Sequence, residues 1–257
     1  MYDDVNKINK RRLDNYYIGL YFYRYTFTIS SDSDVSNLVV YFVVGCDVSS
    51  RRKLLLVKKC HENNTRFYLE ALQHLKSRGL NNIIFCQLEN LPIIRKSLKI
   101  VYPNAVLIDP IELPIKAIKQ YCNSSYKSAI ERKYMSLYLH DTLDEYNVSK
   151  NEFNEEINQK LILLILEKYL EKIPEYYKYD VELRKVMLNH NFYITFGEKI
   201  RKILRKYDKI DNINQVLDEI VIVLTINENH RFINKKTWAD LLEYIYKNID
   251  ENILESC

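Results

Sequence analysis

The amino-acid sequence predicts an α/β protein with a mixed sheet in its first half and helices in its second half. Three stretches near the start are rich in aromatic and β-branched residues, which strands prefer. Strand and helix patterns then alternate up to about residue 108, and only helical periodicity follows. A chain of 257 residues with 47% hydrophobic content is long enough to bury one substantial core.

The first three strands are expected to form an antiparallel meander. Tyr16 to Thr28 is rich in aromatic and β-branched residues, and the polar run at 30–34 predicts a turn after it. Asn37 to Cys46 is almost continuously apolar, which indicates a strand buried on both faces. Lys53 to Lys58 is the third predicted strand.

A helix, a fourth strand, a second helix and a fifth strand are expected next. Asn63 and Asn64 can cap the first helix, and Gly79 ends it. Asn82 to Cys86 predicts a short buried strand, and Ala105 to Ile108 predicts another.

The helix between these two strands has clear start and stop signals. Asn90 can cap it, Pro92 lies in its first turn, and Pro103 stops it. Three antiparallel strands followed by alternating helices and strands are what an RNase H-like sheet needs. We therefore predict an RNase H-like mixed sheet.

The rest of the chain is predicted to be helical. Helices are expected at Ala129 to Tyr146, Lys150 to Ile173, Val181 to Asn189, Phe196 to Tyr207, Ile213 to Leu224, and Thr237 to Ile249. No long linker interrupts them, so 16–257 is expected to be one domain with a helical insertion at about 120–180. Residues 1–15 carry several Lys and Arg residues, including Lys10, Arg11 and Arg12, and are expected to be a short basic tail.

Composition excludes several classes of protein and site. The five cysteines (Cys46, Cys60, Cys86, Cys122 and Cys257) form no C-x-x-C pair, so we expect reduced thiols and no zinc site. The first residues do not resemble a signal peptide, and the longest apolar run, Leu161 to Leu166, is far below the roughly 20 residues of a membrane helix. A soluble, cytoplasmic protein without a membrane partner is expected. The net charge of +4 argues neither for nor against a polyanionic partner.

Four phrases of the sequence resemble one enzyme family. They run from Val44 to Asp47, from Phe67 to Leu80, from Glu89 to Pro92, and from Val101 to Ala105. In this order and at these spacings the chain is similar, from about residue 16 to 245, to Mutator-family transposases of bacterial insertion sequences. The resemblance implies that helical DNA-binding elements would lie before residue 1, and it makes this chain a truncated relative, a domesticated descendant or a decayed copy.

The resemblance also implies a catalytic chemistry. Transposases of this kind use three carboxylates on an RNase H-like sheet to hold two divalent metal ions, which activate water or a DNA 3′-hydroxyl. The phrases put Gly19 in the place of the first acid, Glu89 in that of the second and Ile194 in that of the third. Glu89 is thus the one candidate catalytic residue, no metal ligand set is assigned, and Mg²⁺ is expected only with an intact site. We predict a catalytically degenerate relative.

An active enzyme and an interaction domain are the alternatives to this degenerate relative. An active transposase would combine Glu89 with displaced acids such as Asp47 and Glu198, whereas Asp47 can also be a simple turn residue. A third hypothesis is a protein-interaction domain with no role on nucleic acid. Convergence of acids around Glu89 would favour the active enzyme.

One predicted helix carries a basic face that can follow a phosphate backbone. Lys199, Lys202, Arg205 and Lys206 lie opposite the apolar residues of the same segment, although a solvated helix face has the same pattern. From these four residues we predict weak, non-specific DNA binding. An intact transposase or a second copy of the chain is the other expected partner.

Overall fold

The computed structural model describes residues 4–250 apart from 31–34, 61–65, 89–90, 123–125, 158–159, 189, 208, 227 and 229. For residues 30, 35 and 190–194 it describes the backbone only. The chain divides into two compact units. Unit 1 comprises 1–109 and 191–257, and unit 2 comprises 110–190. The prediction of one domain with an insertion at about 120–180 stays a prediction.

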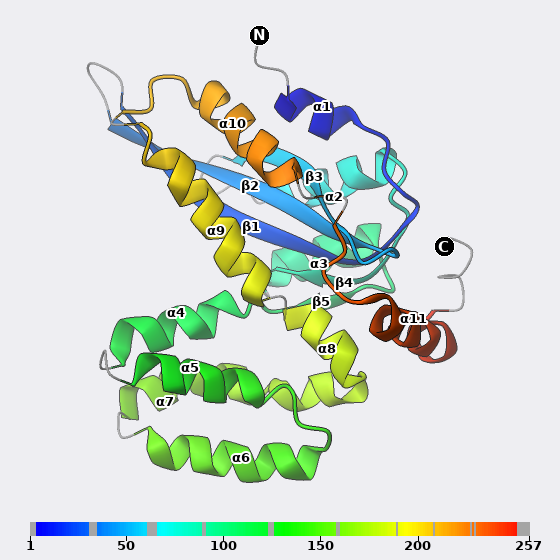
Figure 1. Ribbon diagram of the computed structural model, residues 1–257, viewed down its shortest axis with the longest axis vertical. Coiled ribbons are helices and arrows are strands. Elements are labelled where there is room, and N and C mark those ends of the chain that lie inside the picture. The colour runs from blue at the N-terminus through cyan, green and yellow to red at the C-terminus, as the bar shows by residue number, and fades with distance from the viewer. Residues whose placement is uncertain are drawn as a thin grey trace. The chain divides into compact units, whose positions relative to one another are not determined.

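Unit 1 is built on a five-stranded mixed sheet (Figure 1). The strands are β1 (Tyr16–Ser30), β2 (Val35–Asp47), β3 (Arg52–Cys60), β4 (Asn82–Gln87) and β5 (Val106–Ile108). Their order is β3-β2-β1-β4-β5, in which β1, β2 and β3 pair antiparallel and β1, β4 and β5 pair parallel. The mixed α/β class, the five strands and the antiparallel meander are therefore confirmed.

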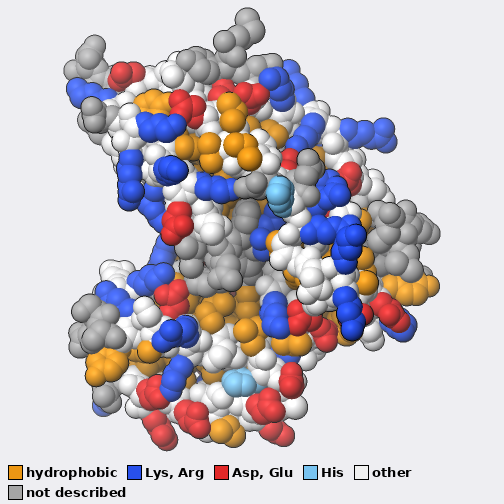
Figure 2. Space-filling view, viewed as in Figure 1, with side chains coloured by type: hydrophobic (Ala, Val, Ile, Leu, Met, Phe, Trp, Pro, Cys, Tyr) orange, Lys and Arg blue, Asp and Glu red, His pale blue; other side chains and the backbone are white. Residues whose placement is uncertain are grey.

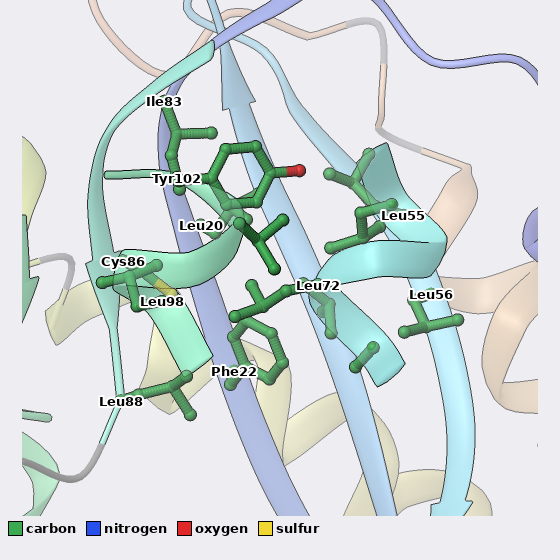
Figure 3. Close-up of a cluster of buried hydrophobic side chains, with 14 of the residues drawn as sticks. Leu20, Phe22, Leu55, Leu56, Leu72, Ile83, Cys86, Leu88, Leu98 and Tyr102 are labelled. Carbon is green, nitrogen blue, oxygen red and sulfur yellow. The ribbon is translucent and has the colours of Figure 1, made fainter. Parts of the chain in front are cut away.

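Two helices cover one face of this sheet and enclose an apolar core (Figure 3). They are α2 (Phe67–Ser77) and α3 (Pro92–Val101). Leu20 and Phe22 of β1 pack here with Leu72 of α2 and Leu98 of α3. Gly79 follows α2 with a φ of 111°, the left-handed conformation that the sequence predicted at the helix end. The predicted caps at 63–64 and 90 lie outside the described residues.

The opposite face of the sheet carries the helix α9 (His190–Leu204) (Figure 1). Phe196 is buried there, with its ring 4.6 Å from that of Tyr23 and 5.6 Å from that of Phe42. Two further helices of unit 1 are α10 (Ile213–Thr225) and α11 (Lys235–Asn248). Aromatic packing thus fixes α9 on β1 and β2.

The N-terminal segment contains a helix where a short basic tail was expected. Helix α1 (Asp4–Lys10) packs beside β3 and α10, and both Ile8 and Leu13 are buried. The Asn9 amide exchanges two hydrogen bonds with the backbone of Val57, at 2.8 and 2.9 Å. Arg11 pairs with Glu228 at 2.8 Å. The apolar residues Ile8 and Leu13, which lie among the basic ones, give this segment a buried side. The prediction of a basic tail missed this side because it considered only the basic residues.

Unit 2 is helical. It contains α4 (Glu112–Tyr121), α5 (Lys127–Ser136), α6 (Leu143–Glu156), α7 (Lys160–Leu170), the 3₁₀ helix η1 (Ile173–Lys178) and α8 (Val181–Leu188). The single helix predicted from Ala129 to Tyr146 is wrong, because Thr142 caps α6 by accepting a hydrogen bond from the Glu145 amide at 3.2 Å. The helix predicted from Lys150 to Ile173 is likewise divided between α6 and α7.

The core of unit 2 contains hydrogen-bonded polar groups. The hydroxyl of the buried Tyr146 donates to the Leu170 carbonyl at 2.7 Å. The guanidinium of the buried Arg184 donates to the carbonyls of Tyr138 and His140, at 2.7 and 2.9 Å. Within the described part of the chain, no helix combines the length and the apolar character needed to cross a bilayer.

Candidate functional site

Gly19 lies in the middle of the sheet, where the resemblance puts the first catalytic carboxylate. It pairs with Cys46 of β2 on one side and with Phe85 of β4 on the other. The ring of Phe85 lies over it, so that a Cβ added at Gly19 would be 2.1 Å from Phe85 Cζ, well below the 3.0 Å that real Cβ contacts respect. Tyr21 packs edge-on against the same ring at 5.5 Å between centroids. An aromatic side chain therefore fills the space that a side chain at Gly19 would need.

The other two positions of the implied catalytic set are only partly described. Glu89 lies outside the described residues, and β4 ends two residues earlier at Gln87. Ile194 belongs to helix α9, and the structure describes its backbone but not its side chain. The catalytic role of Glu89 and the convergence of Gly19, Glu89 and Ile194 stay predictions.

Asp47 is engaged in the turn between β2 and β3. Its Oδ1 accepts hydrogen bonds from the amides of Ser49 and Arg51, at 2.8 and 2.9 Å. Its Oδ2 lies 3.0 Å from Lys53 Nζ. Burial lowers the pKa of Lys53, but hydrogen bonds to Asp14 and Asp47 outweigh it and raise that pKa above its ordinary value. Both carboxylate oxygens are thus occupied by donors, as in an Asx-type turn.

The position of Asp47 also separates it from the carboxyl end of β4. Asp47 pairs with Tyr17 of β1, whereas Gln87 at the end of β4 pairs with Tyr21. Four residues of strand correspond to about 13 Å. Glu198, the other displaced acid considered, is exposed on α9. The described residues contain no group of three or more His, Cys, Asp or Glu side chains that could hold a metal ion.

The cysteines of the sheet are poor candidates for nucleophiles. Cys46 and Cys86 are buried, and burial raises the pKa of both thiols far above the ordinary value. Such thiols stay protonated and unreactive. Cys46, Cys60, Cys86 and Cys122 are free cysteines, and Cys257 lies outside the described residues.

Helix α9 has the amphipathic character that the sequence predicted. Ile200 and Ile203 are buried, whereas Lys202, and Arg205 one residue beyond the end of α9, are exposed. Figure 2 shows that Lys and Arg side chains gather along the part of unit 1 where α9 runs. Lys206 is partly neutralised, because its Nζ lies 3.4 Å from Glu219 Oε2. A role of this face in DNA binding stays a prediction.

One comparison with known proteins decides the family of the chain. The family model described as "Transposase, Mutator family" matches residues 1–235. The chain belongs to the Mutator family of transposases. The resemblance stated from four short phrases is thereby confirmed, and it associates the chain with transposition and mobile elements. No curated protein matches the chain.

This Mutator-family chain also has a cationic hollow that the sequence did not predict. The hollow measures about 310 Å³ and lies beside α9 in unit 1. Its charged lining comes from Arg52, Lys199 and Arg231, and His230 also lines it. The doublets at 51–52 and 230–231 were the available signal, but nothing local in the sequence indicates that they meet.

Proposed function

We propose that this chain is a transposase-related protein that does not perform DNA strand transfer and that associates weakly with DNA through α9. The observation that carries the first part is the ring of Phe85 in the place of a side chain at Gly19. A two-metal mechanism needs several carboxylates aimed at the same metal ions. Here a carboxylate at position 19, the first of the three, would have to displace the buried ring of Phe85.

The strand arrangement supports an RNase H-like assignment for unit 1. Three antiparallel strands are followed by two parallel strands on the other side of β1, in the order β3-β2-β1-β4-β5. Crossover helices α2 and α3 precede β4 and β5. We propose that this sheet is the transposase scaffold without its metal-binding carboxylates.

Nothing in the described geometry favours an active enzyme with displaced acids. The oxygens of Asp47 already accept hydrogen bonds from two amides and pair with Lys53. A metal ion would have to break these interactions. Asp47 is also distant from the end of β4, because it pairs with Tyr17 of β1 whereas Gln87 pairs with Tyr21. Glu89 alone is too small a ligand set for two metal ions.

A cleavage assay tests the loss of strand transfer. The purified chain is incubated with supercoiled plasmid and with an end-labelled duplex, in Mg²⁺ or Mn²⁺. We expect no nicking and no joining. Metal-dependent cleavage that Glu89→Gln abolishes would overturn the proposal.

The constructive form of this test has to remove the Phe85 ring. Gly19→Asp, Ile194→Glu and Phe85→Ala are combined, with and without Glu89→Asp, because the aspartate at Gly19 needs the space that the ring occupies. The same set without Phe85→Ala is the matched control, and we expect it to be inactive or unfolded. Metal-dependent nicking by the combined variant alone would show the scaffold to be competent.

The DNA association is tested by charge-matched variants. Lys199, Lys202, Arg205 and Lys206 are replaced together by Gln, and the control replaces the exposed, scattered residues Lys96, Arg132, Lys168 and Lys236. Both variants lower the net charge from +4 to 0. The parent is expected to bind all sequences alike and to weaken as salt rises, because phosphate contacts position a protein without reading bases.

The two variants should then behave differently. Loss of the α9 charges is expected to weaken binding to every sequence and to flatten the salt dependence by about 0.9 in log–log slope per lost phosphate contact. The control should bind nearly as the parent does. Equal losses in both variants, or parental binding by the α9 variant, would contradict the proposed face and would favour a protein-interaction role.

A further inference from the structure

Strand β3 lies at an edge of the sheet, because β2 is the only strand that pairs with it in the described part of the chain. An edge strand presents N–H and C=O groups to which a strand of another molecule can bind. The middle of β3, from Leu54 to Val57, consists of four buried apolar residues. An apolar edge of this kind has to be protected if the protein is to stay separate from its copies.

Side chains bind the outer backbone groups of β3 where a neighbouring strand would otherwise bind. The Asn9 amide group accepts from the Val57 N–H and donates to the Val57 carbonyl, at 2.9 and 2.8 Å. The Glu228 carboxylate accepts from the Leu54 N–H at 2.6 Å, and Arg11 donates to the Leu54 carbonyl. Leu54 and Val57 thus each have both backbone groups occupied, as they would be in a ladder with another strand.

The guanidinium of Arg78 joins the N-terminal segment to the same strand. It donates to the Leu55 carbonyl at 2.6 Å, and to the carbonyls of Ile8 and Arg11 at 2.6 and 2.9 Å. Leu55 has no partner in the pairing of β3 with β2, so it is a bulged residue. Residues 4–13, which we call the strap, are therefore held on the edge of β3 by a network of polar contacts.

The strap lies over a hollow and is anchored by few apolar side chains. The hollow measures about 540 Å³ and is lined by residues of α1, β3 and α10, among them Asn9, Val57 and Leu217. Within the strap only Ile8 and Leu13 are buried. The attachment of the strap therefore depends to a large extent on its hydrogen bonds to β3.

We propose that the strap is an autoinhibitory contact that prevents β3 from pairing with β3 of a second copy of the chain. Leu54 and Val57 both direct their backbone groups away from β2. A two-fold antiparallel pairing can therefore set Leu54 of one copy opposite Val57 of the other. Each of these pairs exchanges two backbone hydrogen bonds, which replace the bonds given by Asn9, Arg11 and Glu228.

Two lysines beside this run have their charges offset within each copy. The two-fold register sets Lys53 of one copy opposite Lys58 of the other, and like charges in this position repel. Lys53, however, lies 3.0 Å from Asp47, and Lys58 lies 3.0 Å from Glu70. These ion pairs reduce the repulsion, so the strap is the main barrier to pairing. The proposal rests on the edge of β3 and is independent of DNA association through α9.

Sedimentation equilibrium of the full chain tests the strap. The test variant combines Asn9→Ala and Arg11→Gln, which removes the bonds to Val57 and to the Leu54 carbonyl. The control has the same net charge and combines Arg12→Gln, exposed in the strap, with Tyr146→Phe, which removes a buried hydrogen bond in unit 2. We expect the test variant to dimerise at least about tenfold more tightly than the parent and the control, the change that one hydrogen bond accounts for.

Amide hydrogen exchange shows whether β3 is the surface that pairs. In the test variant at low protein concentration, the Val57 amide should exchange at least about tenfold faster than in the parent, because its acceptor is gone. Where the dimer forms, the protection of this amide should return. If circular dichroism shows the test variant to be unfolded, Asn9→Ala alone replaces it, with Tyr146→Phe alone as the control.

Three outcomes overturn the proposal. The first is a test variant that stays as monomeric as the control. The second is a dimer in which the Val57 amide remains unprotected, because the copies would then associate through another surface. The third is equal dimerisation by the control, because a general loss of stability would then be sufficient.

Discussion

Two regions of unit 1 differ in how their side chains are matched to their surroundings. At Gly19, the Phe85 ring fills the space of a side chain and Tyr21 packs against that ring. The cationic hollow brings Arg52, Lys199 and Arg231 together, and none of its lining residues in the described part of the chain is acidic. The first region contributes packing energy to the fold, whereas the second gathers positively charged side chains.

The contrast teaches that close packing at one position and a cluster of positive charge at another are independent features of unit 1. A position closed by a buried ring resists a single substitution, because the new side chain has no space. A solvated cationic residue can be replaced with little effect on the fold. Substitutions at Gly19 should therefore change stability much more than substitutions in the hollow.

The largest effect is expected for Gly19→Asp. Its Cβ would clash with the Phe85 ring and its carboxylate would enter the sheet interior, so we expect a loss of at least about 4 kcal/mol in the free energy of unfolding. Urea denaturation measures it, with Gly19→Ala, expected to lose about 2 kcal/mol, as the control for the clash alone. In a Phe85→Ala background the cost of Gly19→Asp should fall. Additive losses would contradict the close packing at Gly19.

Glu112 extends the comparison to a buried charge in unit 2. Burial, opposed by a backbone hydrogen bond and by Lys116, raises the pKa of Glu112 from an ordinary 4.5 to about 7. Its Oε2 has no hydrogen-bond partner within the described structure. The folded state therefore favours the protonated acid, and this stability is complete below pH 4.5 and is lost as the pH rises through 7.

Glu112→Gln should remove this pH dependence. At pH 8 we expect the variant to be more stable than the parent by up to about 3 kcal/mol, which is the energy equivalent of that pKa rise, and near pH 4.5 the two should be equal. Urea unfolding of both proteins at pH 4.5 and pH 8 measures the difference. A difference that is the same at both pH values would show that ionisation of Glu112 plays no part.

Asp47→Ala is expected to cost about 2 kcal/mol, because two amides of the turn lose their acceptor and Lys53 loses an ion pair. Asp47→Asn, which keeps an acceptor oxygen, should cost clearly less. Thermal unfolding measures both. If Mg²⁺ stabilised the parent but not Asp47→Ala, the turn role would give way to that of a metal ligand.

The smallest effect on stability is expected at the hollow itself. Arg231 is exposed and joins the fold through its backbone, so Arg231→Gln should change the free energy of unfolding by less than about 0.5 kcal/mol. A large loss of stability would instead show that the Arg231 side chain supports the fold, as the packing at Gly19 does.

Local patterns predicted the sheet well and the helical unit less well. Each of the five strands has aromatic or β-branched residues bounded by turn residues, and its ends move by at most two positions. In unit 2 the apolar periodicity continued across Thr142, where only the capping hydrogen bond reveals that one helix ends and another begins. The helix α1 was missed because basic residues outnumber the two buried apolar ones around it.

The sequence by itself determined the α/β class, the five strands, the family and the amphipathic character of α9. These features depend on hydrophobic periodicity and on short sequence motifs, and both can be recognised from residues that are close together in the chain. Only the tertiary structure decided that Phe85 fills the space at Gly19 and that Arg52, Lys199 and Arg231 share one hollow. Strand register and helix packing bring together residues that are distant in the chain, and no local pattern encodes which distant side chain occupies a given space.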